Sequence, residues 1–257
     1  MLLCIDVGNS HLYGGIFHEE QIKLRFRGTS NNSTSDELGI FLKTVLRENN
    51  YSPKEIKQIA ICSVVPQLDY SLRAACIKYF IINPFCLQPN VKTGLHLQYH
   101  NYLEIGADRI ANAIAATHFY PNQDLIVIDF GTATTFCVIN AAQCYLGGVI
   151  IPGVRLSADA LSKNTAKLPS VEIIKPKCII GKSTIAGIQA GIFYGIVGAC
   201  REIIQQISLQ GFATKPPLVI ATGGFAAFFE SQKIYDVLLP DLVLHGIRLA
   251  FHANQLT

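Results

Sequence analysis

The stretch Leu2–Ser10 reads LLCIDVGNS, and Leu125–Thr135 reads LIVIDFGTATT. Each is an apolar run that ends in Asp, followed by one spacer residue, Gly and a small polar residue, and a second strand-like run comes after it. An Asp at a strand end can hold a hydrated cation, and Gly lets backbone amides approach phosphate oxygens that a Cβ would keep away. One copy alone is equally typical of an Asp that caps a tight hairpin turn. Two copies in one chain predict a phosphate-binding half-domain that is used twice.

The composition indicates a folded protein without a nucleic-acid partner. Half of the 257 residues are hydrophobic, which is enough for a substantial core. The net charge of +3 comes from 21 basic and 18 acidic residues that are scattered along the chain, with no run of Lys and Arg to follow a nucleic-acid backbone. The eight cysteines form no C-x-x-C pair and lie mostly in apolar runs, as reduced thiols do. These features favour a cytoplasmic protein.

Neither a signal peptide nor a membrane span is expected. The N-terminus begins directly with a strand-like run and lacks a basic leader. The segment Ser183–Cys200 is uncharged, but its polar residues and glycines favour a buried helix. Gly187, Gly191 and Gly195 are four residues apart and share one helical face, where another helix can pack closely. This face is either a subunit interface or a packing surface within the same lobe.

The first part of the chain reads as an antiparallel meander followed by alternating helices and strands. Three apolar stretches, Leu2–Val7, His11–Phe17 and Gln21–Arg27, are separated by brief turns. Thr34 and Glu37 resemble a capping box at the start of a helix, whose apolar residues recur at helical spacing. We further expect a strand at 59–65 and helices at 68–80 and 107–119. The turn residues 120–122 then mark a lobe boundary, which predicts domains at 1–120 and 121–257.

The second part repeats this order of elements. Strands are expected at 125–129, 134–140, 143–151 and 218–221, helices at 157–162, 184–207, 225–230 and 241–253, and a loop at 165–177. The predicted class is therefore α/β, with two similar lobes that meet at a cleft.

The paired turns and the late Thr222-Gly223-Gly224 turn resemble the actin-like ATPase superfamily, which includes sugar kinases and Hsp70 chaperones. The resemblance implies two ribonuclease H-like lobes, each a mixed five-stranded sheet with flanking helices, whose two turns hold ATP phosphates from both sides. Gly223 and Gly224 would lie against the nucleoside. By itself, the Gly pair is also consistent with an ordinary Gly-rich helix start.

A second phosphate motif is rejected. Gly181-Lys182-Ser183-Thr184 looks like the end of a Walker A loop, but that loop needs Gly at position 176, which is Pro. The stretch is better explained as a loop that enters a helix, with Ser183 or Thr184 as the N-cap. The amide-rich start of that helix suits an anionic ligand.

The sequence Gly106-Ala107-Asp108-Arg109 places an acid and a base side by side at a helix start. Asp108 is suited to accept the proton of a substrate hydroxyl, and Arg109 to meet a carboxylate or phosphate. The alternative is an Asp stabilised by the helix dipole next to a surface Arg.

Seven stretches together resemble the type III pantothenate kinases over nearly the whole chain. In order they are DVGNS, GADRIANAIAA, IDFGTATTF, LGGVIIPGV, TAKLP, IGKSTIAGIQAGIFYG and ATGG. The resemblance implies transfer of the ATP γ-phosphate to the primary hydroxyl of pantothenate, the first step of coenzyme A synthesis. It also implies Mg²⁺, a monovalent cation (K⁺ or NH₄⁺), and a homodimer with its substrate site at the subunit interface.

Residue roles follow from the same resemblance. Asp108 is the expected catalytic base, Asp129 helps to bind the monovalent cation, and Asp6 holds Mg²⁺ through water. Thr184 would come from the neighbouring subunit. The expected ATP-binding residues are Asp6, Val7, Gly8, Asn9, Ser10, His11, Leu12, Tyr13, Thr132, Gly223 and Gly224, and the expected substrate-binding residues are Tyr99, Gly106, Ala107, Asp108, Arg109 and Thr184.

Two departures and two alternatives accompany this interpretation. Ser10 stands where the family usually has Thr, which keeps the hydroxyl, and Tyr102 stands where relatives commonly have Pro, which affects the backbone path before Gly106. One alternative is a kinase or phosphohydrolase of the same fold with another acceptor. The other is a regulatory relative that binds nucleotide without turnover. The Asp108-Arg109 pair argues against the first, and the retained Asp6, Asp108 and Asp129 argue against the second.

Overall fold

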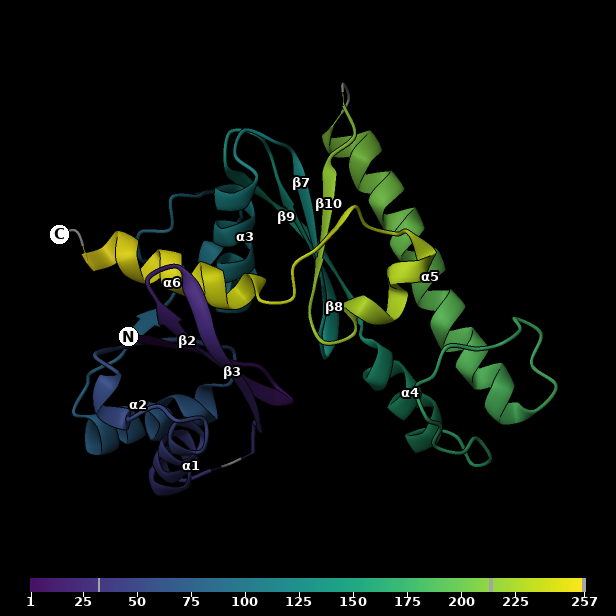
Figure 1. Cartoon of the computed structure of the whole chain (residues 1–257). Helices are drawn as coiled ribbons and strands as arrows, with labels where there is room; N and C mark the ends of the chain where they lie inside the picture. The colour runs from purple at the N-terminus through teal and green to yellow at the C-terminus, as the bar shows by residue number, and fades with distance from the viewer. Residues whose placement is uncertain (32, 213–214, 256–257) are drawn as a thin grey trace. The chain divides into compact units, whose positions relative to one another are not determined.

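The computed structural model describes residues 1–31, 33–212 and 215–255 (Figure 1). The chain divides into two compact units. The first unit comprises Met1–Leu95, His100–Ala115 and the segment that begins at Leu242, and the second comprises His96–Tyr99 and Ala116–Asp241. The expected α/β class is confirmed.

The first unit is built on a five-stranded mixed sheet with strand order β3-β2-β1-β4-β5. Strands β1, β2 and β3 form the expected antiparallel meander, while β4 and β5 are added in parallel. The bounds are β1 Leu2–Val7, β2 His11–His18, β3 Gln21–Thr29, β4 Gln58–Ser63 and β5 Phe85–Leu87.

Helices cover both faces of this sheet (Figure 1). Helix α1 (Ser35–Glu48) begins at the expected capping box, in which Thr34 and Glu37 exchange hydrogen bonds. It packs against α2 (Pro66–Phe80), and the side chains between them and the sheet form one apolar core. Helix α6 (Leu242–Gln255) contacts β1, β4 and β5. The remaining elements are α3 (Ala107–Phe119), whose residues 116–119 belong to the second unit, and the short helices η1 (Pro53–Glu55) and η2 (Tyr102–Glu104).

The placement of α6 differs from the simple division of the sequence into 1–120 and 121–257. Its buried side chains include Leu242, Leu244 and Ile247. Gly246 lies so close to the Ala111 carbonyl of α3 that a Cβ at this position would collide with it. Packing over the first sheet therefore places the C-terminal helix in the first unit.

The second unit is built on a six-stranded sheet with strand order β11-β10-β7-β8-β9-β6. Strands β7, β8 and β9 are antiparallel, and β10 pairs in parallel with β7. The sheet contains the four strands expected from the sequence and two more, the two-residue strands β6 and β11 at its edges, which makes one strand more than the five that the resemblance implies. The bounds are β6 His96–Leu97, β7 Leu125–Phe130, β8 Ala133–Ile139, β9 Cys144–Pro152, β10 Leu218–Thr222 and β11 Val237–Leu238.

Three helices pack in the second unit: α4 (Val154–Lys163), α5 (Thr184–Gly211) and η3 (Ala226–Gln232). Helix α5 supplies Ile188, Phe193 and Ile196 to the apolar core. Ser183 is its N-cap, and its Oγ accepts a hydrogen bond from the Ala186 amide, which confirms the helix-entry interpretation. In the part of the chain that the structure describes, no helix is long and apolar enough to cross a membrane.

Candidate active site

The first Asp turn connects β1 to β2. The Gly8 amide donates to the His11 carbonyl at 3.0 Å, and the side chains of Asn9, Ser10 and His11 are exposed. Asp6, at the end of β1, is half-buried. A carboxylate beside an exposed turn with hydroxyl and amide groups fits Mg²⁺, which proteins bind through one or two carboxylates together with substrate phosphates and water.

Asp6 belongs to a row of side chains that crosses four strands. It pairs with Tyr13 on one side and with Cys62 on the other, and Tyr13 pairs with Arg27. Register partners on neighbouring strands point to the same face of a sheet. The Arg27 guanidinium lies 5.0 Å from the centre of the Tyr13 ring. The row therefore places a cation, an aromatic ring, a carboxylate and a thiol on one face.

Asp108 lies in the first turn of α3, in the same unit as Asp6. Its Oδ1 accepts a hydrogen bond of 2.7 Å from the Arg109 amide, and the Arg109 guanidinium donates to the Glu104 carbonyl at 3.2 Å. A Cβ at Gly106 would collide with the Asp108 carboxylate, so this position has no room for a side chain.

Burial raises the pKa of the Asp108 carboxyl above the usual value of an aspartate. The Arg109 amide and guanidinium oppose part of this shift, since both stabilise the ionised form. A carboxylate with a raised pKa is a stronger base than an exposed aspartate and suits proton transfer from an alcohol.

Cys62 links the two acidic positions. It is fully buried in β4, is the register partner of Asp6 on β1, and has the charges of Asp6 and Asp108 among its neighbours. Burial, followed by these negative neighbours, holds the pKa of the thiol well above its usual range. The first unit therefore brings Asp6 and Asp108 to the same neighbourhood.

The second Asp turn, between β7 and β8, has a different neighbour. The Gly131 amide donates to the Ala133 carbonyl at 3.2 Å, and Asp129 pairs with Thr222 of β10. Gly223 follows Thr222 with φ +90°, and a Cβ there would meet Oδ1 of Asp129 and the Phe130 backbone. Only glycine fits this conformation and this approach. The strand-Thr-Gly-Gly turn and the Asp129 carboxylate are thus directly adjacent, and a carboxylate among backbone groups fits a cation with oxygen ligands.

The start of α4 also lies at this turn. Gly153, its N-cap, donates its amide to the Thr132 carbonyl at 3.1 Å, and a side chain at 153 would collide with the carbonyls of Gly131 and Thr132. The first amides of a helix carry a partial positive charge. They add to the polar groups around Thr132.

Two expected substrate residues, Tyr99 and Thr184, lie in the second unit, whereas the 106–109 motif lies in the first. Tyr99 is 37 % exposed, and its ring centre lies 6.4 Å from that of Tyr145. Thr184 is exposed at the start of α5. Within its unit, neither residue is part of the Asp129 turn.

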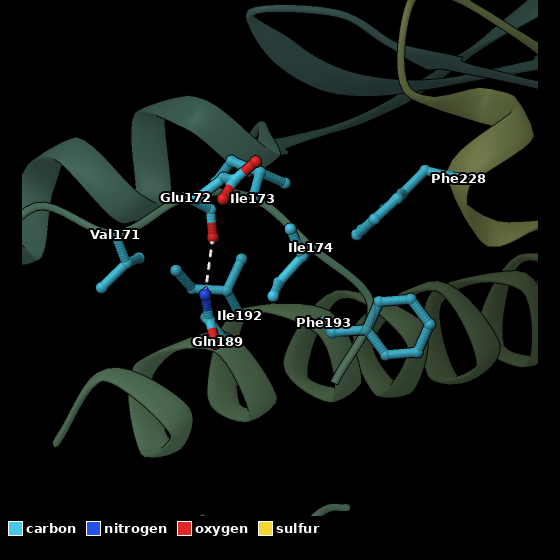
Figure 2. A pocket seen from close by; sticks show the side chains of 8 residues that line it. All are labelled: Val171, Glu172, Ile173, Ile174, Gln189, Ile192, Phe193 and Phe228. Carbon is cyan, nitrogen blue, oxygen red and sulfur yellow. Dashed lines mark hydrogen bonds between the residues drawn. The ribbon is translucent and has the colours of Figure 1, made fainter. Parts of the chain in front are cut away.

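The pocket shown in Figure 2 does not suit a substrate. It lies between α5, η3 and the loop at 171–174, and Gln189 donates to the Glu172 carbonyl at 3.0 Å across it. Its volume is about 10 Å³, the space of a single water molecule. The pocket is a packing gap.

Sequence reasoning did not identify Cys62, Arg27 or Gly153 as functional candidates. Cys62 and Arg27 sit in ordinary strands, and only the register of β4 and β3 brings them to Asp6 and Tyr13. Gly153 lies in the LGGVIIPGV stretch, and its Pro-Gly dipeptide is a signal for a chain break.

Sequence comparisons decide the family. A family model described as type III pantothenate kinase matches residues 2–206. The chain belongs to the type III pantothenate kinase family. A type III pantothenate kinase of Legionella pneumophila (strain Corby) is 67 % identical over 254 residues, which cover 99 % of each chain. Type III pantothenate kinase 1 of Francisella tularensis subsp. holarctica (strain OSU18) is 48 % identical over 99 % of this chain and 100 % of its own.

Solved structures agree on the fold of the family. A Campylobacter jejuni protein assigned to the Baf family of transcriptional activators matches with a TM-score of 0.62 at 19 % identity, over 99 % of this chain and 100 % of its own. The ROK hexokinase of Thermus thermophilus matches with a TM-score of 0.51 at 11 % identity, over 100 % and 99 %. At these identities the likeness concerns the fold alone, and it agrees with the expected α/β fold of two lobes that each contain a mixed sheet.

Proposed function

We propose that this chain transfers the γ-phosphoryl group of ATP to the primary hydroxyl of pantothenate, the first step of coenzyme A biosynthesis. The observation that carries the proposal is its membership of the type III pantothenate kinase family, shown by the match over residues 2–206 and by 67 % identity to a relative along nearly its full length. The reaction needs ATP and a divalent metal ion, for which we propose Mg²⁺.

The two Asp turns are proposed to bind ATP. In the first unit, residues 6–13 would meet the phosphates through the exposed Asn9, Ser10 and His11, while Asp6 would hold Mg²⁺ through water. In the second unit, Thr132 would contact the phosphates, and Gly223 and Gly224 would lie against the nucleoside. Phosphoryl transfer is catalysed mainly by positioning and charge neutralisation, so metal ions and backbone amides suffice without a Walker lysine.

Asp108 is the proposed catalytic base. Its hydrogen bond from the Arg109 amide fixes the carboxylate, which lies against Gly106 where a side chain would collide with it. In a loose transition state the hydroxyl proton leaves late, so an ionised, well-placed carboxylate is sufficient. Asp108 acts in its ionised form, and its pKa is raised. As the pH is lowered, activity should therefore begin to fall at a pH above the usual pKa of an aspartate.

Substrate contacts are proposed for Tyr99, Gly106, Ala107, Arg109 and Thr184. Arg109 is the natural partner of the pantothenate carboxylate, because a guanidinium binds carboxylates through paired hydrogen bonds. Asp129 is proposed to bind a monovalent cation, K⁺ or NH₄⁺, next to the Gly223 backbone.

A homodimer is also proposed, with Thr184 supplied to the site of the other subunit. Outside its own stretch of helix, a Cβ added at Gly187, Gly191 or Gly195 would meet no described atom within 4 Å, and all three glycines are exposed, so side chains on this face would point into open space. Near the start of α5, Ile179 and Ile180 are 64 % and 79 % exposed. A glycine face on α5 and exposed isoleucines in the loop that leads into it suit close packing against a second copy. We expect Ile180→Lys to shift the gel-filtration mass towards a monomer, and an unchanged mass together with unchanged activity would argue against this interface.

The main test is a coupled ADP-release assay with pantothenate, with and without K⁺. Turnover that depends on pantothenate supports the proposal, whereas ATP turnover without it, or with a different small alcohol only, supports another kinase or phosphohydrolase. Nucleotide binding without turnover would support a regulatory relative. We place the activity in the cytoplasm, in line with eight free thiols.

A further inference from the structure

Strand β9 contains an irregularity near its start. Val138 of β8 pairs with Gly147, whereas the next residue of β8, Ile139, pairs with Tyr145. Leu146 is therefore an extra residue, a β-bulge, and Gly147 beside it has a φ of +127°. Because side chains alternate between the two faces of a strand, the extra residue moves Tyr145 from one face of the sheet to the other.

The bulge places Tyr145 on the face of the second sheet that carries Asp129. Asp129 pairs with Thr135 of β8. Cys137 and Ile139 follow Thr135 at alternate positions and share its face. Tyr145 pairs with Ile139, and its hydroxyl donates to the buried Cys137 sulfur at 3.5 Å. Without the extra residue, Tyr145 would take the opposite face, which packs on α5.

Tyr99 rests on the buried Tyr145 ring. The two ring planes are inclined at 60°, and their centres lie within the range of interacting aromatic pairs. The backbone before Tyr99 is fixed to the same strand, because Leu97 pairs with Tyr145 and the Gln98 amide donates to the Tyr145 carbonyl at 3.0 Å. A Cβ at Gly147 would lie 3.9 Å from the Tyr99 ring, so the bulge also leaves a surface without a side chain beside that ring.

We propose that Tyr145 is a positioning residue, which orients the partly exposed Tyr99 side chain for contact with pantothenate. This inference rests on the proposed function, because the substrate contact of Tyr99 is part of it. Tyr145 is fully buried and acts through Tyr99. A side chain that is ordered before binding loses less conformational freedom when the substrate arrives. Tyr145 therefore affects how tightly the acceptor is bound more than how fast the phosphoryl group is transferred.

The kinetic test compares Tyr145→Leu and Tyr145→Phe with Phe136→Leu. Phe136 is also a buried aromatic residue of this sheet, but it packs on the opposite face, so its truncation is a matched control for lost core packing. We expect Tyr145→Leu to raise the KM for pantothenate about fivefold, as loss of an aromatic pair implies, with unchanged KM for ATP and a smaller change in kcat. Tyr145→Phe keeps the ring and should remain within about twofold of the wild type.

A double variant tests whether the effect passes through Tyr99. In a Tyr99→Ala background, Tyr145→Leu should cause no further rise in the KM for pantothenate, because the side chain that it positions is gone.

A fluorescence measurement follows residue 99 without turnover. The chain contains no tryptophan, so Tyr99→Trp introduces a single fluorophore at this position. Adding Tyr145→Leu should lower the anisotropy of its emission and strengthen its quenching by acrylamide, since the ring loses its support. Adding Phe136→Leu should change neither quantity.

Equal values of the KM for pantothenate in Tyr145→Leu and Phe136→Leu, or an equal rise from Tyr145→Leu with and without Tyr99, would overturn the inference. Fluorescence that does not respond to Tyr145→Leu would do the same. If Tyr145→Leu does not fold, Tyr145→Met, which also lacks a ring, takes its place. Failure of the proposed function has a different signature, since the wild type would then show no pantothenate-dependent turnover while the fluorescence still reports whether Tyr145 holds residue 99.

Discussion

The Asp6 turn and the Asp129 turn are built alike but have different neighbours. Both follow the first strand of a meander, and in both a parallel strand lies on the other side of that strand. Cys62 of β4 pairs with Asp6, and Thr222 of β10 pairs with Asp129 at the equivalent place. After Thr222 comes Gly223, whose backbone closes on Asp129, whereas Cys62 connects Asp6 to the region of Asp108.

This difference shows that a repeated motif receives different neighbours from the strand beside it, which is the basis for the different roles proposed for the two turns. Next to Asp6 lie a thiol and a second carboxylate, an environment that suits the proposed binding of a metal-nucleotide complex and the proposed proton transfer. Next to Asp129, a glycine backbone suits a flat nucleoside and a cation with oxygen ligands. The two turns differ in length by only one residue, since the first comprises Gly8–His11 and the second Gly131–Ala133.

The largest effect is expected from Asp108→Asn. This variant tests whether proton transfer takes place in the first unit, which contains both Asp6 and Asp108. Removing the base while keeping the shape should lower kcat about 10³-fold, within the range for general base catalysis, with little change in ATP affinity. Steady-state kinetics with pantothenate and ATP measure both. An unaffected kcat would remove Asp108 from its proposed role.

A pair of variants, Asp6→Asn and Asp129→Asn, tests whether the two turns are specialised. We expect Asp6→Asn to lower kcat/KM about 10²-fold with a raised Mg²⁺ requirement, and Asp129→Asn to lower it about tenfold with a raised K⁺ requirement. Titrations of each ion at saturating concentrations of the other separate the two effects. If both variants respond to the same ion, the comparison of the turns is wrong.

A smaller effect is expected from Gly106→Ala, because the new Cβ collides with the Asp108 carboxylate and must turn it. A misplaced base should cost about tenfold in kcat. Gly211→Ala is the control, since it lies at the end of α5 away from the proposed glycine face and a Cβ there would meet no described atom within 4 Å outside its own stretch of helix. Equal kcat values for the two variants would show that the geometry around Asp108 is not critical.

The smallest effect concerns stability. The pKa of Asp108 is raised in the folded state, so its ionisation weakens folding as pH rises. Asp108→Asn should therefore melt a few degrees above the wild type near pH 7, with a difference that shrinks towards the usual aspartate pKa.

Asp36→Asn should change the melting temperature in the opposite direction. Hydrogen bonds from Lys78 and Tyr79 lower the pKa of Asp36, so its charge supports folding above the usual aspartate pKa. This variant should melt below the wild type near pH 7 and approach it as pH falls. Thermal melts of both variants between pH 4 and pH 7 measure the two trends, and shifts of the same sign would contradict the environment assigned to Asp108.

The sequence by itself determined the local elements and the residue types of the candidate site. Apolar alternation predicted the two meanders, the Thr34–Glu37 box predicted the start of α1, and the run after Gly106 predicted α3, because these signals depend on neighbours within a few residues. The two Asp-x-Gly turns and the 106–109 motif were readable for the same reason.

Only the tertiary structure decided what lies beside these motifs. It placed Cys62 next to Asp6, closed Gly223 on Asp129, packed α6 over the first sheet and added β6 to the second. Each of these contacts joins residues far apart in the chain, and strand register and helix packing are set by the burial of whole faces. Local sequence carries no record of which face a distant segment will cover, so the carboxylates were visible in the sequence but their neighbours were not.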